Sequence, residues 1–102
     1  MIYVIATIEL VPGRRAEFLQ QLQANVPAVL AENGCVEYAP AVDIQTSIPA
    51  QGAARPDFVT VIEKWADVEA LEAHLIASHM IVYRAKVKDL VRHVSLQVLE
   101  SA

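Results

Sequence analysis

The sequence is poor in cysteine, glycine and charge: one cysteine, three glycines and 20% charged residues among 102. A lone Cys35 cannot close an internal disulfide, and without a CxxC pair it does not indicate a structural zinc site. The eight Lys and Arg residues form no basic run beyond Arg14-Arg15, and twelve Asp and Glu give a formal net charge of −4. This balance argues against nucleic acid or an anionic membrane surface as a partner.

Long hydrophobic runs are also missing. The apolar stretch from Ile2 to Ile8 is interrupted well before the ~18 residues that a membrane span needs. No basic segment or cleavage signal follows Met1. We therefore expect a cytoplasmic protein with no membrane partner.

Apolar residues, in contrast, are abundant, at 55% of the chain. A chain of this length forms about one small domain, so we expect a single domain over residues 1–102. So much apolar surface on so small a body favours a homodimer, in which a second copy covers one face.

The period of the apolar residues changes several times along the chain, and each change marks an expected element. Asn33-Gly34 is typical of a helix C-terminus that is capped by a residue in the left-handed conformation. Asp67 and Ser78 are typical N-caps. Pro40 favours an edge strand or a bulge, and residues 45–57 form a loop long enough to act as a flap. The predicted strands cover residues 1–10, 35–44, 58–65 and 93–98, and the predicted helices cover 14–32, 68–75 and 78–91.

This order, with the second helix broken in two, predicts an α+β, ferredoxin-like β-α-β-β-α-β fold. Right-handed crossovers place both helices on one face of a four-stranded antiparallel sheet. The other face would be bare in a monomer, so we expect it to pack on a second copy. A pocket is expected between the sheet and the split helix.

His74 is the first candidate for chemistry. It lies beside the Leu71 and Leu75 stripe, so its ring should point toward the sheet, where an imidazole can exchange a proton near neutral pH. A core histidine bonded to the backbone would show the same spacing. His79 follows five residues later, about 140° around a continuous helix, which does not favour a metal pair.

The aromatic candidates are Trp65, Tyr38 and Tyr83. Each has a structural alternative, because Trp65 can fill the core at a strand end and the tyrosines can cap it. Glu63 suggests an ion pair at an interface. The sequence contains no GxGxxG, P-loop, GxSxG or HExxH motif, so flavin, nicotinamide and nucleotide cofactors have no local support.

Several segments taken together resemble the antibiotic biosynthesis monooxygenase family, and most closely its bacterial quinol monooxygenase branch. The resemblance runs from about Ile2 to Leu99. The segments are Gly34-Cys35, Tyr38-Ala39-Pro40, Val42-Asp43, Ile62-Glu63-Lys64-Trp65, Leu71-Glu72-Ala73-His74-Leu75, His79-Met80, Tyr83 and Val87-Lys88.

The resemblance implies a dimeric α+β barrel and oxidation of a quinol or related polyphenol by O₂, without flavin, haem or metal. It also implies roles for single residues. His74 would be the catalytic base or hydrogen-bond partner, Trp65, Tyr38 and Tyr83 would line the substrate pocket, and His79 would lie near its mouth.

Other branches of the superfamily degrade haem with an asparagine on the first strand, a tryptophan in the second helix and a histidine in the third. The matching positions here look like Thr7, His74 and Arg84, which disfavours haem degradation. Two further hypotheses stay open: a non-catalytic dimeric binding protein for small aromatic ligands, and an enzyme that processes a small signalling molecule.

Overall fold

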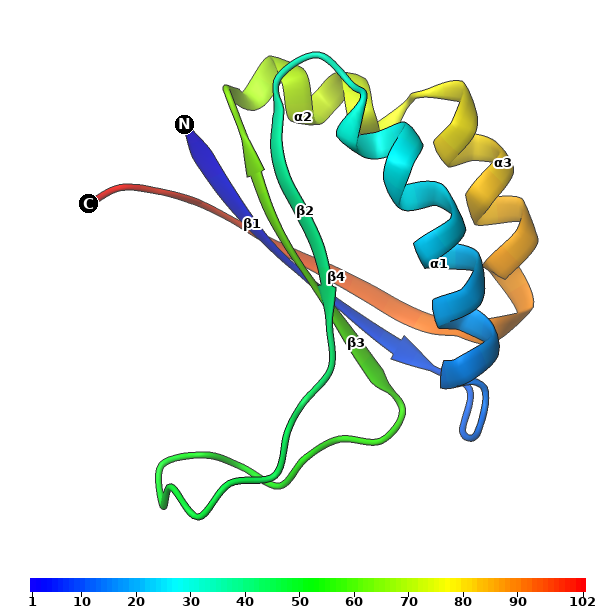
Figure 1. Ribbon diagram of the computed structural model, residues 1–102, viewed down its shortest axis with the longest axis vertical. Coiled ribbons are helices and arrows are strands. Elements are labelled where there is room, and N and C mark those ends of the chain that lie inside the picture. The colour runs from blue at the N-terminus through cyan, green and yellow to red at the C-terminus, as the bar shows by residue number, and fades with distance from the viewer.

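The computed structural model describes all residues, 1–102, and contains a four-stranded antiparallel sheet with three α-helices. All three helices lie on one side of the sheet (Figure 1). This confirms the predicted α+β, ferredoxin-like fold, with the second helical segment split. The elements are β1 (Ile2–Leu10), α1 (Arg15–Leu30), β2 (Cys35–Ala41), β3 (Phe58–Trp65), α2 (Val68–Leu75), α3 (Ser78–Val87), a 3-10 turn (Lys88–Leu90) and β4 (Val91–Glu100).

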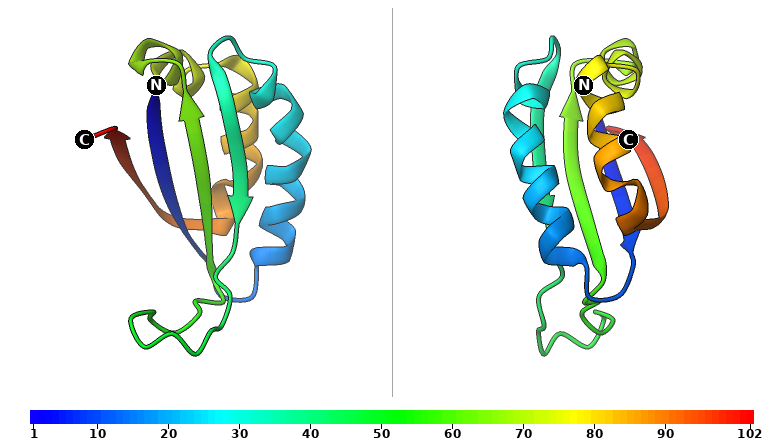
Figure 2. Two further views of the ribbon diagram at one scale, coloured as in Figure 1. Left: turned by 60° about the vertical axis from the view of Figure 1, so that its left-hand side comes forward. Right: turned by 90° about the vertical axis from the view of Figure 1, so that its right-hand side faces the viewer.

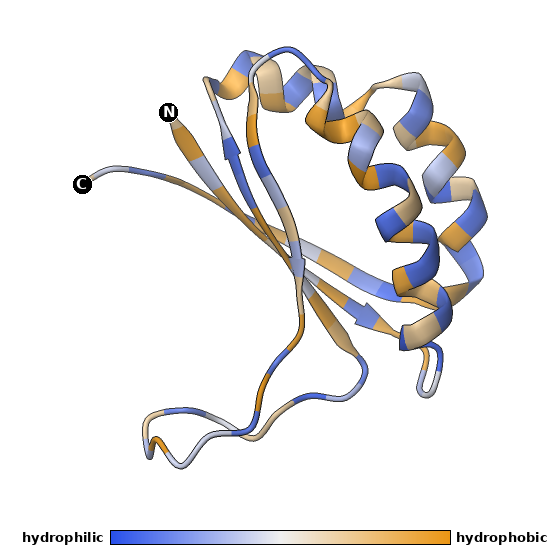
Figure 3. Ribbon diagram, in the orientation of Figure 1, coloured by the Kyte–Doolittle hydropathy of each residue, from blue (hydrophilic) through white to orange (hydrophobic).

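The core lies between the helices and one face of the sheet, whose strand order is β2-β3-β1-β4. Alternate residues of β1 are buried, and the register pairs Ala6 with Val61 of β3 and with Leu96 of β4. Directly opposite residues of antiparallel strands share a face. Val61 and Leu96 therefore also point to the helix side. Figure 3 shows the resulting alternation of apolar and polar residues along the strands.

Each helix buries a narrow apolar stripe on this face. In α1 the buried residues are Phe18, Leu22 and Val29, spaced as one side of a helix requires. Asp67 caps α2 as predicted, because its side chain accepts a hydrogen bond of 2.8 Å from the backbone N–H of Ala70. None of the helices combines the length and the apolar character needed to cross a membrane.

The end of α1 differs from the prediction. The helix stops at Leu30, because the backbone N–H of Glu32 bonds to the carbonyl of Val29 and tightens the last turn. Gly34 does have a left-handed φ of +85°, but it lies in the turn that enters β2. A Cβ at Gly34 would lie 2.7 Å from the Cβ of Ala70, so this turn packs tightly against α2.

Further boundaries need correction. α3 ends at Val87, whereas the prediction continued the helix to residue 91, and β4 covers Val91–Glu100 rather than residues 93–98. Ser78 is the first residue of α3 and makes no capping hydrogen bond, since Ala77 occupies the N-cap position. β2 ends at Ala41 rather than at residue 44, because Ala41 opposite Thr60 is its last pair with β3. Pro40 lies on β2, an edge strand of the sheet, as predicted.

The loop between β2 and β3, residues 42–57, extends away from both layers (Figure 2). Arg55 and Asp43 form an ion pair across its base, with 2.7 Å between Nε and Oδ2. The hydrogen bonds from Arg55 hold the pKa of Asp43 at about 2. Ile44 and Ile48 of this loop are exposed.

The helices do not cover β4. Val94, Leu96 and Val98 share the face of the β1 core residues, yet they are 50%, 43% and 45% exposed. This uncovered strip leaves room between β4 and α3. The candidate site lies in that space.

The opposite face of the sheet carries both apolar and polar residues. Tyr3 of β1 is opposite Leu99 of β4, and Ile5 is opposite Ile62 of β3. Ile62 and Leu99 are 40% and 43% exposed. These four side chains form an apolar patch at the centre of a face that no helix covers.

Candidate functional site

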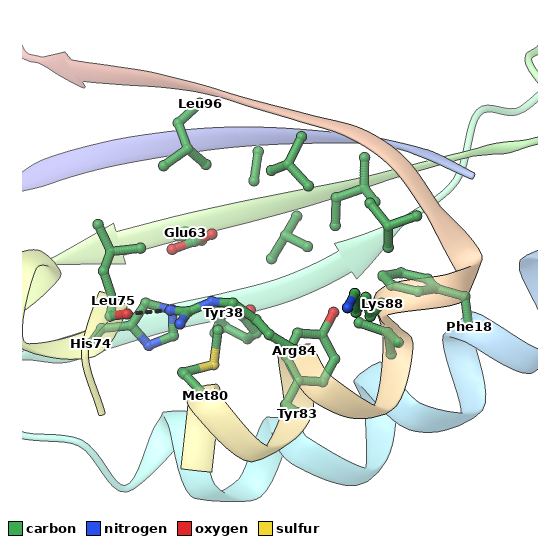
Figure 4. Close-up of a pocket in the computed structure, with 16 residues that line it drawn as sticks. Phe18, Tyr38, Glu63, His74, Leu75, Met80, Tyr83, Arg84, Lys88 and Leu96 are labelled. Carbon is green, nitrogen blue, oxygen red and sulfur yellow. Dashed lines mark hydrogen bonds between the residues drawn. The ribbon is translucent and has the colours of Figure 1, made fainter. Parts of the chain in front are cut away.

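A cavity of about 390 Å³ lies between the helices and the uncovered part of the sheet. Twelve of its 16 lining residues are hydrophobic, which suits an apolar ligand. In Figure 4, Glu63 and Leu96 lie on the strand side, Met80 and Tyr83 on the α3 side, and His74 at one end. The other lining residues are Ala6, Ile8, Phe18, Tyr38, Val61, Leu75, Arg84, Val87, Lys88, Val91 and Val94.

His74 is buried at the end of this cavity. It follows Leu71 by one helical turn on the buried side of α2, and its ring lies 4.7 Å from that of Trp65, centroid to centroid. The predicted direction of the side chain, toward the sheet, is confirmed. Burial lowers the pKa of His74, and the hydrogen bond to Glu32 opposes this effect. The ring is therefore neutral at pH 7 and able to accept a proton.

Glu32, in the turn after α1, holds one nitrogen of this ring. Nδ1 of His74 donates a hydrogen bond of 2.7 Å to Oε2 of Glu32, and Nε2 of His79 donates to the same oxygen at 3.1 Å. Nε2 of His74 has no hydrogen-bond partner in the protein. Every fully enclosed side-chain nitrogen or oxygen does have one, so Nε2 is not fully enclosed. Nε2 is therefore accessible from the cavity that His74 lines.

Glu63 places a carboxyl group on the cavity wall. Nε1 of Trp65 donates a hydrogen bond of 2.9 Å to its Oε1. Burial raises the pKa of Glu63 to about 7, although the bond from Trp65 acts in the other direction. Near neutral pH this carboxyl group can therefore donate as well as accept a hydrogen bond.

The ion pair suggested for Glu63 is absent, because the alternation of β3 turns Glu63 inward and Lys64 outward. Lys64 instead lies 4.0 Å from Glu37 on β2, at the surface.

Tyr38 and Tyr83 both line the cavity. The ring of Tyr38 on β2 lies 5.5 Å from that of His74, and the ring of Tyr83 on α3 lies 6.4 Å from that of Phe18. Burial raises the pKa of both phenols. Both hydroxyls therefore stay neutral and can donate a hydrogen bond to a ligand oxygen.

Two cationic side chains, Arg84 and Lys88, also line the cavity. A nitrogen of Arg84, Nη2, donates a hydrogen bond to the carbonyl oxygen of Leu75, drawn as a dashed line in Figure 4. This contact ties α3 to the end of α2. Positive charge at a mostly apolar cavity can stabilise an anion inside it.

Trp65 and His79 lie outside the lining of this cavity. Trp65 is completely buried, because it is the last residue of β3 and His74 covers it. Trp65 therefore packs behind His74. The resemblance implied that Trp65 lines the substrate pocket, but it does not line this cavity. His79 lines a smaller pocket of about 260 Å³ together with Asn25 of α1. Tyr83 lines both pockets.

The break in the helical segment brings the two histidines together. A continuous helix would direct His74 and His79 apart, but the chain leaves the helix at Ile76 and Ala77, so both rings turn toward Glu32. Their centroids are 6.4 Å apart. No group of three or more histidine, cysteine or acidic side chains is arranged to hold a metal ion.

Sequence reasoning missed Glu32, Lys88 and the inward position of Glu63. Glu32 falls on the polar side of the predicted helix, so its spacing indicates a solvated residue. The alternation of β3 does place Glu63 and Trp65 on one face of the strand, and this signal could have found their contact.

Known proteins similar to this chain include both sequence relatives and solved structures. The family model described as antibiotic biosynthesis monooxygenase matches residues 1–86. The "Probable quinol monooxygenase YgiN" of Escherichia coli K12 is 40% identical over 102 residues, covering 98% of this chain and 97% of that protein.

Two of the solved structures that share the fold are more than 25% identical to this chain in sequence. PA3566 from Pseudomonas aeruginosa has a TM-score of 0.80 and 28% identity, covering 99% of this chain and 93% of that one. Rv0793 from Mycobacterium tuberculosis has a TM-score of 0.78 and 27% identity, covering 99% and 94%. The resemblance read from the sequence is confirmed, and the chain belongs to the antibiotic biosynthesis monooxygenase family.

Proposed function

We propose that this protein is a cofactor-independent monooxygenase that oxidises quinols or related polyphenolic aromatics with O₂. The observation that carries the proposal is His74, whose Nδ1 is bonded to Glu32 and whose Nε2 is accessible from an apolar cavity. The name of the Escherichia coli relative supports quinols as the substrate class.

The chemical difficulty is that triplet oxygen reacts slowly with a closed-shell phenol. A phenolate is a better electron donor than a phenol, so a base that removes the hydroxyl proton helps the first electron to reach O₂. His74 is the proposed base. The apolar walls reduce the contact of water with the anion and with the radical pair that this transfer forms.

The proposed reaction needs no external reductant. A quinol such as 1,4-naphthoquinol reacts with O₂ to give a hydroxynaphthoquinone and water. The four electrons that O₂ accepts all come from the substrate, one oxygen atom enters the ring, and the other leaves in water with two hydrogens from the substrate. The protein therefore has only to deprotonate, orient and shield the substrate.

Other lining residues have proposed supporting roles. Tyr38 and Tyr83 are proposed to donate hydrogen bonds to the two substrate oxygens, and Glu63 in its protonated form is a third donor. Arg84 and Lys88 supply positive charge that favours the phenolate. These five side chains border one cavity, which supports their acting on one ligand.

We also propose that residues 1–102 form one domain that acts as a homodimer. The sheet face opposite the helices carries the patch of Tyr3, Ile5, Ile62 and Leu99, and no element of the chain covers it. A second copy of the same face would bury this patch.

The test is oxygen consumption by the purified protein supplied with 1,4-naphthoquinol. We expect uptake well above the autoxidation rate and, with ¹⁸O₂, one labelled oxygen in the quinone. Adding catalase distinguishes this reaction from a two-electron oxidation that releases hydrogen peroxide, because catalase returns oxygen only from hydrogen peroxide. Uptake no faster than autoxidation, or an unlabelled quinone, would exclude the proposed monooxygenase.

The second candidate is a non-catalytic dimeric binding protein for small aromatic ligands. The volume of the cavity and its two neutral tyrosine hydroxyls favour it, because these features hold a phenol without any reaction. Such a protein would bind naphthoquinol and leave dissolved oxygen unchanged. Processing of a small signalling molecule remains a further hypothesis, which uptake with quinols does not address.

A further inference from the structure

Glu32 lies where three parts of the chain meet. It follows α1, whereas His74 belongs to α2 and His79 to α3, and both rings direct a nitrogen at its oxygen Oε2. The side chain of Glu32 is 15% exposed and that of His74 only 3%. The shared carboxylate is therefore largely shielded from water.

This contact determines the tautomer of His74. An ionised carboxylate accepts hydrogen bonds and has none to donate, so the proton of neutral His74 must be on Nδ1. The lone pair is then on Nε2, the nitrogen accessible from the cavity. A free imidazole has no such constraint, because either nitrogen can carry the proton.

The same contact stabilises a charge on the ring. When Nε2 takes a proton, the resulting imidazolium lies 2.7 Å from the Glu32 carboxylate. Opposite charges attract more strongly where little water screens them. A carboxylate behind a catalytic histidine has this effect in hydrolases, where it orients the ring and stabilises its cation.

We propose that Glu32 is a positioning residue that makes His74 the cavity base, by holding Nε2 toward the cavity and by stabilising the imidazolium. The inference rests on the proposed function for its role in turnover. Glu32 is not among the residues that line the cavity, so it acts through His74. His79 bonds to Glu32 as well, and the Asn25 amide nitrogen lies 3.3 Å from Nδ1 of His79.

The charges around His74 predict opposite effects for two variants. Glu32 favours the protonated ring, whereas positive charge on His79 and Arg84 of α3 disfavours it. On the sheet side, the titratable groups that line the same cavity are Tyr38 and Glu63. Loss of the Glu32 charge should therefore lower the pKa of His74, and loss of the His79 ring should raise it.

The experiment compares Glu32→Gln and His79→Gln with the wild type, using Glu72→Gln as the control. Glu72 is an exposed glutamate on α2, the helix that carries His74. Nuclear magnetic resonance of ¹⁵N-labelled histidine rings reports the tautomer and pKa of His74 without any substrate. We expect a proton on Nδ1 in the wild type, a pKa lower by about one unit or more in Glu32→Gln, and a higher pKa in His79→Gln.

Steady-state oxidation of 1,4-naphthoquinol supplies the second readout. In Glu32→Gln we expect kcat to fall at least about tenfold with KM nearly unchanged, and the acid limb of the pH profile to move to lower pH. Glu32→Asp keeps the charge and should recover part of kcat. Glu72→Gln should match the wild type in both readouts.

The outcomes separate this inference from the proposed function. A wild type that consumes no oxygen, but whose His74 pKa falls in Glu32→Gln, contradicts only the reaction. Normal turnover in Glu32→Gln, or a wild-type proton on Nε2 of His74, overturns the role of Glu32. If Glu32→Gln does not fold, the tautomer of His74 in the wild type still decides, because a proton on Nε2 overturns the role of Glu32 without any variant.

Discussion

The indole Nε1 of Trp65 donates a hydrogen bond of 2.9 Å to Oε1 of Glu63, two residues earlier on the same strand face. Both side chains are buried, yet only Glu63 reaches the cavity. The bond therefore orients a carboxyl group that is buried from bulk water but accessible to a ligand in the cavity.

This burial predicts how stability depends on pH. The pKa of Glu63 is raised to about 7 in the folded protein from 4.5. The folded state then binds more protons than the unfolded state between these values, so the free energy of unfolding falls as the pH rises from 4.5 to 7 and levels off above it. The total effect is on the order of 3 kcal/mol.

Glu63→Gln removes this titration. The unfolding free energy of the variant relative to the wild type should therefore rise between pH 5 and pH 8. Urea unfolding of both proteins at the two pH values measures it. His74 has a lowered pKa, and its charging destabilises both proteins below about pH 6.5 in the same way, so it cancels in the difference. An equal difference in unfolding free energy between the two proteins at pH 5 and pH 8 would contradict a buried, titrating Glu63.

His74→Ala tests the proposed base. We expect turnover of 1,4-naphthoquinol to fall on the order of a hundredfold, the usual scale of general acid–base assistance, while the protein stays folded. If the ring only fills the core, the variant should instead lose stability, with turnover per folded molecule almost unchanged. Thermal unfolding and oxygen uptake on one preparation decide between these results.

Ile62→Lys tests the proposed dimer. A lysine at the centre of the uncovered sheet face should dissociate or unfold the dimer, because its charge would be buried without a partner. Ile76→Lys is the matched control, since Ile76 lies after α2 on the helix side and is 77% exposed. Sedimentation measures both. A wild type that sediments as a folded monomer at micromolar concentration would remove the dimer.

The purified protein should carry no flavin, haem or transition metal. The prediction rests on the missing nucleotide and haem-ligand motifs, since the chain has no glycine-rich phosphate loop and its haem-branch positions look like Thr7, His74 and Arg84. Visible absorption after dialysis and elemental analysis check it. A persistent band, or metal in stoichiometric amount, would be the contrary result.

Much of the fold was predictable because local patterns and tertiary packing agree. Alternation along residues 58–65 placed Glu63 and Trp65 on one face, and the stripe of Leu71 pointed His74 inward. Errors arose at the ends of elements, such as α1, where the choice between Leu30 and Gly34 depends on hydrogen bonds formed in the last turn.

The candidate site was predictable only in part. His74, Tyr38 and Tyr83 were found from spacing and family resemblance, and all three line one cavity. Trp65 was expected in the lining, but the ring of His74 covers it. Such coverage depends on how α2 rests on β3, which no pattern within either segment encodes.

The sequence by itself determined the order of the elements, the family and the inward direction of His74, because period, capping residues and short motifs are local properties of the chain. Only the tertiary structure decided that Glu32 binds both histidines. That contact joins residues 42 and 47 positions apart. It depends on where α1 ends and on where the helical segment breaks after His74. These two chain segments lie side by side in the fold, but no local pattern in the sequence connects them.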